Sequence, residues 1–229
     1  MKQISVVIPT YNEQERIART VRCVFDHGGG KLLEVLVVDA GSSDHTAQRA
    51  TAAGATVLHS PQQGRAAQMN YGASRAAGSI LYFLHADSHP PKGFATDIID
   101  ACKEGVDAGC FRLAFDRDHP VLKCYAWFTR FDVDIFRFGD QSLFVEHTVF
   151  EQLGGFREDH KVMEDQEIVR RIRRRHPFVV LSSSVTTSAR RYLDVGVIKL
   201  QLIFLVIVIL YYIGVDQQRL VNIYKYWLS

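Results

Sequence analysis

Runs of consecutive apolar residues, each four or five residues long, alternate with helix-like segments along the first half of the chain. Such short runs are typical of strands buried on both faces of a parallel sheet. The predicted strands are residues 4–8, 35–38, 55–58 and 80–84, and the predicted helices are 13–25, 44–53 and 66–77. This order of elements predicts a parallel sheet with right-handed crossover connections.

The second half of the chain predicts further elements of the same domain. Helices are expected at 94–104 and 164–175, and strands at 108–115, 142–145 and 178–182. No repeat or low-complexity linker interrupts this pattern. We therefore expect one α/β domain over residues 1–192.

The chain ends in a hydrophobic segment. Residues 202–215 are fourteen uncharged, mostly large or β-branched residues, fewer than the ~20 that span a bilayer. The segment can be a buried or subunit-interface helix, a helix on a membrane surface or, in third place, a transmembrane span. Gly214 and Asp216 predict a helix end and a new helix start. Residues 193–229 are thus expected to form a hydrophobic C-terminal helical appendage.

Composition narrows the class of protein only a little. The net charge of +2 gives no reason to expect a nucleic-acid partner. The four cysteines show neither a CxxC pair nor zinc-like spacing, which favours reduced thiols. The first residues enter a strand directly, without the apolar stretch of a signal peptide, so we expect a cytoplasmic protein.

Acidic or polar residues directly follow three of the predicted strands. The first strand leads into Pro9-Thr10-Tyr11-Asn12-Glu13, the second ends on Asp39, and the fourth leads through His85 to Asp87. Ligands of such sheets bind beyond the carboxyl ends of the strands. Mg²⁺ and Mn²⁺ prefer one or two carboxylates together with phosphate oxygens. The pattern predicts a site that binds a polyanion through a metal, with Asp87 as its main protein ligand.

Several of these residues also have an ordinary structural explanation. Asp39 is either a turn residue or an acceptor for a ribose or a nucleobase. His85 is either a second metal ligand or a hydrogen-bonded structural histidine. Arg65, at the start of a predicted helix, is either a surface arginine or a phosphate contact.

Three acids open the predicted helix 164–175, namely Glu164, Asp165 and Glu167. The helix dipole favours acids in a first turn, which is a sufficient structural reason for them. The functional alternative is a general base that takes a proton from an attacking hydroxyl. Motifs of other enzymes are missing: GxGxxG after the first strand, a complete P-loop, and GxSxG.

Taken together, these segments resemble the family 2 glycosyltransferases. The matching pieces, spread over residues 3–190, are Ser5–Glu13, Val37–Asp44, Leu84-His85-Ala86-Asp87 and Glu164-Asp165. The Leu-His-Ala-Asp form, with Gly139-Asp140-Gln141 and Ser188-Ala189-Arg190-Arg191-Tyr192, looks like a bacterial subgroup whose acceptors are poorly defined.

The resemblance implies a glycosyltransferase A-type fold. Residues 1–115 would be the nucleotide-sugar-binding half and residues 116–192 the acceptor half. The donor would be a nucleotide sugar, commonly a uridine diphosphate (UDP) sugar. The nucleoside pocket would be lined by Pro9, Tyr11, Glu13 and Asp39.

The resemblance also implies a single inverting displacement. Asp87 would hold a divalent cation, Mn²⁺ or Mg²⁺, on the donor diphosphate, and Asp165 would be the general base. His85 stands at the first position of what is usually an Asp-x-Asp motif. By analogy, contacts with the acceptor or with phosphate would come from Gln141, Arg190 and Arg191.

Two other functions fit the same pattern. A non-catalytic nucleotide-sugar binder or membrane-associated scaffold would keep the fold, and a nucleotidyltransferase would consume a nucleoside triphosphate instead of a nucleotide sugar. For the transferase, the hydrophobic C-terminal segment suits a lipid-linked acceptor and a peripheral position on the cytoplasmic face of a membrane. Pairing of two copies through the C-terminal helices is a further interpretation of that segment.

Overall fold

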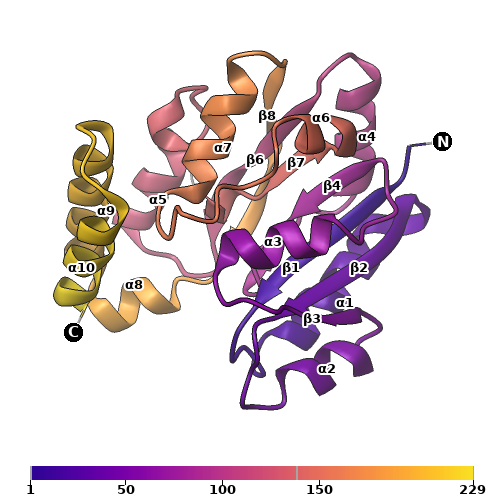
Figure 1. Ribbon diagram of the computed structural model, residues 1–229, viewed down its shortest axis with the longest axis horizontal. Coiled ribbons are helices and arrows are strands. Elements are labelled where there is room, and N and C mark those ends of the chain that lie inside the picture. Colours follow the sequence, from indigo (N-terminus) through magenta and orange to yellow (C-terminus); the bar gives the residue numbers. More distant parts are fainter. Residues whose placement is uncertain (1, 138, 229) are drawn as a thin grey trace.

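Helices cover both faces of one twisted sheet (Figure 1). The structure, a computed structural model, describes residues 2–137 and 139–228, and their strands form a sheet of eight in the order β3-β2-β1-β4-β7-β6-β8-β5. The strands are β1 (Ile4–Thr10), β2 (Leu32–Asp39), β3 (Thr56–His59), β4 (Ile80–Phe83), β5 (Ser88–His89), β6 (Ala108–Phe115), β7 (Leu143–Glu146) and β8 (Phe178–Thr187). Strands β1 to β4 pair in parallel, as do β6 and β8, whereas β7 is antiparallel to its neighbours. The expected mostly parallel α/β sheet is confirmed.

Every helix predicted from the sequence is present, together with others. The helices are α1 (Ile17–Gly28), α2 (Thr46–Ala52), α3 (Arg65–Ala73), α4 (Phe94–Lys103), α5 (Pro120–Phe128), α6 (His147–Gln152), α7 (Glu164–Arg173), α8 (Arg190–Val195), α9 (Val197–Tyr212) and α10 (Gln217–Leu228). Short 3₁₀ turns lie at Gly29–Lys31, Asp134–Phe136 and Gly139–Gln141. Helix α1 begins four residues later than the expected start at residue 13. The reason is that the backbone N–H of Glu13 donates to the hydroxyl of Thr46 (2.8 Å), which holds the chain in a turn there.

Alternation along β1 explains how the sheet is covered. Ile4, Val6 and Ile8 belong to the apolar cluster that α1 and α4 complete, whereas Val7 belongs to the cluster on the α3, α6 and α7 side. All four side chains are completely buried. Burial of one such side chain contributes about 1.5–3 kcal/mol, so both helical layers are anchored on this strand.

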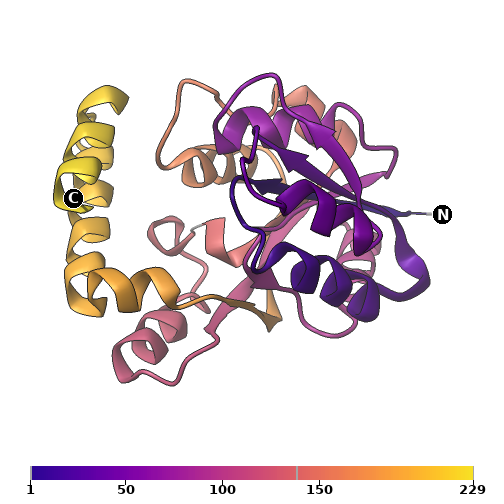
Figure 2. The same cartoon turned by 90° about the horizontal axis from the view of Figure 1, so that it is seen from below.

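The C-terminal segment forms a helical hairpin, α9 and α10, at one end of the molecule (Figures 1 and 2). Helix α8 connects it to the sheet domain, and the expected boundary between residues 192 and 193 falls inside α8. Within the described residues, no helix is both long and apolar enough to span a membrane. The hairpin packs against the domain through α8 and α5, and its helix α9 therefore buries one face and exposes another.

Candidate active site

A cavity of about 500 Å³ lies at the carboxyl ends of β1 and β4. Pockets that hold small molecules and cofactors usually measure about 300–1,000 Å³. Its walls include nine of the eleven residues singled out in the sequence, namely Pro9, Tyr11, Glu13, Arg65, His85, Asp87, Asp165, Arg190 and Arg191. The cavity is thus at the edge of the sheet where the strand pattern places a ligand.

The end of β1 is tied to two distant parts of the chain. The buried amide of Gln68 on α3 donates to the carbonyls of Thr10 (2.9 Å) and Val38 (2.7 Å), which joins the ends of β1 and β2. The carboxylate of Glu13 accepts a hydrogen bond from the guanidinium of Arg190 at 3.4 Å, although 177 positions separate the two residues in the sequence. Burial raises the pKa of Glu13, opposed by Arg190 and reinforced by Asp87. The two halves of the domain are therefore in contact at the carboxyl end of β1.

Asp87 and His85 follow β4 and have different surroundings. Within the described residues, the Asp87 carboxylate has no ion pair or hydrogen bond to another side chain, and burial raises its pKa. The imidazole Nδ1 of His85 lies 3.3 Å from Oδ1 of Asp140. Burial opposes charge on both partners, yet their contact raises the pKa of His85 and lowers the pKa of Asp140. Hence His85 is engaged by a carboxylate, and Asp87 is the carboxylate left for a ligand.

The first turn of α7 carries two buried acids with different partners. Glu164 forms an ion pair with Arg65 at 2.8 Å and is 1% exposed. Asp165 lies against Gly139: a Cβ atom on Gly139 would overlap its Oδ2 and would come within 3.0 Å of His85 Cε1. Burial and the neighbouring Glu164 raise the pKa of Asp165 to about 6, opposed by Arg65. A carboxylate with this pKa is ionised at neutral pH and is a competent proton acceptor.

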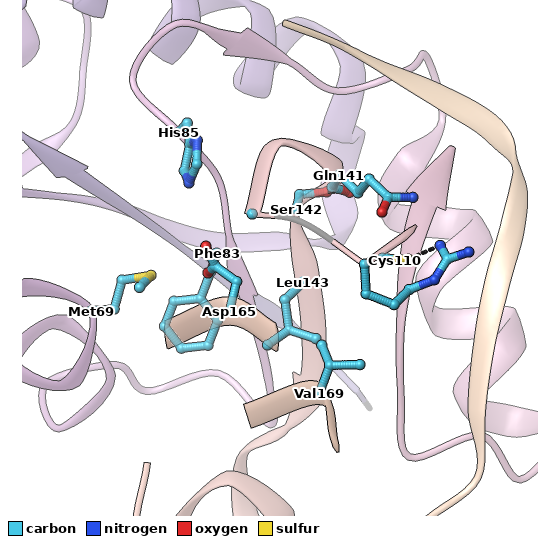
Figure 3. A pocket seen from close by; sticks show the side chains of 11 residues that line it. Met69, Phe83, His85, Cys110, Gln141, Ser142, Leu143, Asp165 and Val169 are labelled. Carbon is cyan, nitrogen blue, oxygen red and sulfur yellow. Dashed lines mark hydrogen bonds between the residues drawn. The ribbon is translucent and has the colours of Figure 1, made fainter. Parts of the chain in front are cut away.

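A second, much smaller cavity lies behind His85 and Asp165 (Figure 3). Its volume of about 20 Å³ is enough for one water molecule. Figure 3 shows Phe83, Leu143 and Val169 at its apolar floor, below His85. Asp165 lines both cavities, as do His85 and Gly139, and it is therefore enclosed by protein on the side of the small cavity. This placement explains why burial is the main cause of its raised pKa.

Two of the expected binding residues lie elsewhere. Asp39 is 2% exposed and its carboxylate accepts from the backbone N–H groups of Gly41 (3.1 Å) and Ser42 (3.0 Å), as a turn residue does. Gln141 is 1% exposed, donates to the carbonyl of Phe111 (3.2 Å) and lines the small cavity only. Their predicted contacts with substrate gain no support from these positions.

The C-terminal hairpin supplies a wall of the large cavity that sequence reasoning did not identify. Four of its side chains line the cavity, namely Phe204, Ile207, Val208 and Tyr224. The guanidinium of Arg191 lies over the ring of Tyr224, 5.2 Å from its centroid. In the sequence these residues read only as part of an apolar helix, because nothing local marks which face meets the site. The hairpin is therefore part of the site as well as an appendage.

The sequence pattern of glycosyl transferase family 2 matches residues 5–157, which is more than half of the chain. The chain belongs to this family. The matched range contains Glu13, Asp39, Arg65 and Asp87 but ends before α7. The expected membership in family 2 is thereby confirmed.

Two curated relatives match part of the chain. Glucosyl-3-phosphoglycerate synthase of Mycolicibacterium smegmatis is 33% identical over 98 residues, which are 39% of this chain and 32% of the relative. Undecaprenyl-phosphate 4-deoxy-4-formamido-L-arabinose transferase of Salmonella paratyphi B is 32% identical over 116 residues, 47% of this chain and 36% of the relative. The matches thus span about a third of the length of these relatives.

Solved structures of glycosyltransferases share the fold. A mannosyltransferase of Pyrobaculum calidifontis, in complex with GDP-Man and Mn²⁺, superposes with a TM-score of 0.66 at 20% identity, over 81% of this chain and 56% of the other. S. aureus TarS 1-349, in complex with UDP-GlcNAc, gives 0.67 at 19% identity over 81% and 58%. Glucosyl-3-phosphoglycerate synthase of Mycobacterium tuberculosis, with Mn²⁺ and UDP, gives 0.61 at 18% identity over 80% and 70%. These likenesses confirm the expected glycosyltransferase A-type fold.

The acids of this family 2 site fit a metal that is shared with a ligand. Across residues 2–137 and 139–228, no three His, Cys, Asp or Glu side chains are placed to hold a metal ion by themselves. Asp87, with Glu13 and Asp140 nearby, brings a carboxylate to the cavity wall, and a phosphate-bound Mg²⁺ or Mn²⁺ needs only one or two from the protein. The residues therefore fit a cation that arrives with a diphosphate.

Proposed function

We propose that the chain transfers a sugar from a nucleotide-diphospho-sugar, a UDP sugar in the first instance, to an acceptor hydroxyl with inversion at the anomeric carbon. One observation carries the proposal: Asp165, the candidate base, and Asp87, the candidate metal ligand, line the same cavity as the end of β1. Membership in family 2 and the crystallised neighbours with nucleotide sugars support it.

The proposed step needs one base on the acceptor side. Asp165 accepts the proton of the acceptor hydroxyl, whose oxygen forms the new bond to the anomeric carbon as the bond to the diphosphate breaks. Attack and departure on opposite faces of the sugar give inversion. Gly139 lies against the Asp165 carboxylate and limits its movement. Burial and Glu164 raise its pKa to about 6, which still leaves it ionised at neutral pH and lets it hold the transferred proton.

The donor side rests on Asp87 and on cations of the cavity wall. Asp87 would hold a Mn²⁺ or Mg²⁺ ion, which neutralises charge on the leaving diphosphate when bound. Arg190 and Arg65 would contact phosphate oxygens of the donor. Arg190 is paired with Glu13 at 3.4 Å, and Arg65 with Glu164 at 2.8 Å. Pro9 and Tyr11 would contact the nucleoside. The contact of His85 with Asp140 occupies its Nδ1, so a contact of His85 with the metal would use Nε2.

Calorimetry and product analysis test this function. UDP with Mn²⁺ should bind the wild type, Asp87→Ala should weaken the metal-dependent binding, and Asp165→Asn should bind normally but release no nucleoside diphosphate from a panel of nucleotide sugars. If UDP binds but none of the donors is turned over, the protein is better explained as a non-catalytic binder. Pyrophosphate release from a nucleoside triphosphate would favour a nucleotidyltransferase. Failure of UDP to bind at all would overturn the proposal.

The hairpin suggests a lipid-borne acceptor as the finer assignment. Its inner face gives the cavity an apolar wall, and the outer face of α9 exposes Ile198, Leu202, Leu205 and Ile209, which follow helical spacing. Exposed apolar stripes of this kind mark membrane or protein contacts. We propose that this stripe lies on a membrane surface and brings the cavity to a lipid-linked acceptor.

Sedimentation with vesicles of phosphatidylglycerol and phosphatidylcholine tests the membrane assignment. The double variant Leu202→Ser, Leu205→Ser should lose vesicle binding, whereas Leu33→Ser, which alters an exposed leucine on β2, should retain it. If the wild type stays in the supernatant and light scattering shows a dimer that the double variant lacks, the stripe joins two copies of the chain instead.

A further inference from the structure

The first residue of α10 makes a specific contact with the segment that precedes α7. The side-chain oxygen of Gln217 accepts two hydrogen bonds, from the backbone N–H of Lys161 (3.2 Å) and from that of Val162 (3.3 Å). Both views show the segment ahead of α7 reaching toward the C-terminal hairpin (Figures 1 and 2). A residue of the hairpin thus binds the backbone three and four positions before Asp165.

This contact is not part of the cap of α10. Asp216 already caps the helix, because its Oδ1 accepts from the backbone N–H of Arg219 at 3.0 Å. The neighbouring Gln218 only donates to Asn222 on the same helix, at 3.1 Å. The Gln217 amide therefore serves the segment at residues 161–162 and nothing else that the described residues show.

The segment held by Gln217 has an unfavourable backbone conformation. Met163, which precedes the first residue of α7, has φ 65° and ψ 19°, in the left-handed region that non-glycine residues rarely adopt. Such conformations cost about 1–3 kcal/mol and persist only where the surroundings enforce them. Here Val162 and Met163 pack against an apolar cluster of the hairpin, built on Ile203, Ile207 and Leu220. The hairpin therefore enforces the conformation of the turn that starts α7.

The position of that turn sets the position of the candidate base. Asp165 is two residues beyond Met163 and lies in direct contact with Gly139, so it has little room to move without colliding. Errors of about 1 Å in the placement of reacting groups can cost about 10²-fold in rate. We propose that Gln217 is a positioning residue: it fixes the turn before α7 so that Asp165 faces the acceptor. This inference rests on the proposed role of Asp165 as base.

Four variants test the inference. Gln217→Ala removes the acceptor of both N–H groups, and Gln217→Glu restores an oxygen acceptor of the same length. Gln218→Ala is the matched control on the same turn of α10, and Asp165→Asn tests the base itself. Two measurements are made on each full-length variant: hydrogen–deuterium exchange of the peptide that covers residues 158–165, and nucleoside diphosphate release from UDP-glucose with Mn²⁺.

The expected pattern separates positioning from loss of fold. Gln217→Ala should exchange faster at residues 161–163 only, keep the wild-type KM for UDP-glucose and lose about tenfold in kcat, within the range for a misplaced group. Gln217→Glu should recover most of kcat, and Gln218→Ala should match the wild type in both measurements.

Either of two results would overturn the inference while the base stands: unchanged exchange at residues 161–163 in Gln217→Ala, or equal kcat losses in Gln217→Ala and Gln218→Ala. Wild-type turnover in Asp165→Asn would instead remove the proposed base, and with it the role of Gln217. Should UDP-glucose not be turned over, the exchange measurement decides, since it needs no substrate.

Discussion

Gly139 and Asp165 are in direct contact, and only the absence of a side chain on Gly139 makes that contact possible. A Cβ atom there would overlap the Asp165 carboxylate and lie 2.7 Å from its Cγ. We therefore expect Gly139→Ala to displace the carboxylate and lower kcat by about 10²-fold, as for other misplaced reacting groups. Binding of UDP with Mn²⁺, measured by calorimetry, should stay near the wild-type value because Asp87 is not touched.

The matched control is Gly30→Ala. A Cβ on Gly30 would meet no atom within 4 Å, so this substitution should leave both turnover and donor binding unchanged. A wild-type kcat in Gly139→Ala would show that Asp165 is not held by this contact.

The pKa of Asp165 predicts an acid limit of the reaction. Burial and Glu164 raise that pKa to about 6, and the base must be ionised to accept a proton. Turnover should therefore fall as the pH drops through about 6. Replacing Glu164 by Gln removes a neighbouring negative charge, so the fall should move to lower pH. The pH profile of kcat/KM for the donor checks both expectations.

The control for the pH profile is Glu104→Gln, which alters an exposed acid on a distant surface. Its profile should overlay that of the wild type. If Glu164→Gln leaves the acid limb where it was, the group that titrates there is not Asp165.

The fold could be predicted because short apolar runs and helical spacing are local signals. Strand β5 has no signal in the sequence, since its two residues, Ser88 and His89, carry no hydropathy pattern. Helix α5 is not among the predicted helices, although Pro120 at its first position and His119, whose side chain accepts from the backbone N–H of Val121, mark its start. Helix α8 cannot be predicted from its hydropathy, because its six residues are too few to show a helical period.

Site residues that directly follow a predicted strand, such as Glu13 and Asp87, could be predicted from the sequence. Their partners could not, because contacts such as Glu13 with Arg190 depend on how the two halves of the domain meet. In the segment Gly139-Asp140-Gln141, the resemblance pointed to Gln141, whereas Gly139 and Asp140 make the contacts with Asp165 and His85. A local sequence pattern shows at which strand end a side chain lies, but not which other side chains it will contact.

Helix α3 depends on a close approach to the sheet that predicts a stability effect. A Cβ on Gly72 would lie 2.5 Å from a methyl of Val7 and 2.8 Å from one of Val38. Since both valines are completely buried, Gly72→Ala should destabilise the fold by about 1–3 kcal/mol, as overpacking does. Urea unfolding measures the change. Ser74→Ala, at the exposed C-terminal end of the same helix, should change stability far less.

Asp87 should contribute to function at a cost in stability. Burial raises its pKa, and the nearby Asp140 reinforces the shift, so the ionised form is less favourable in the folded chain than in the unfolded one. A raised carboxyl pKa means that the folded state loses stability as the pH rises through the ordinary value for aspartate. Asp87→Asn should therefore raise the melting temperature at pH 7 in the absence of metal, while it weakens Mn²⁺-dependent UDP binding.

The control is Asp100, an exposed acid whose contact with Lys103 lowers its pKa. Asp100→Asn should not raise the melting temperature. A drop in the melting temperature of Asp87→Asn would mean that the Asp87 carboxylate stabilises the fold without metal. The proposal that it is held for a metal ion would then be contradicted.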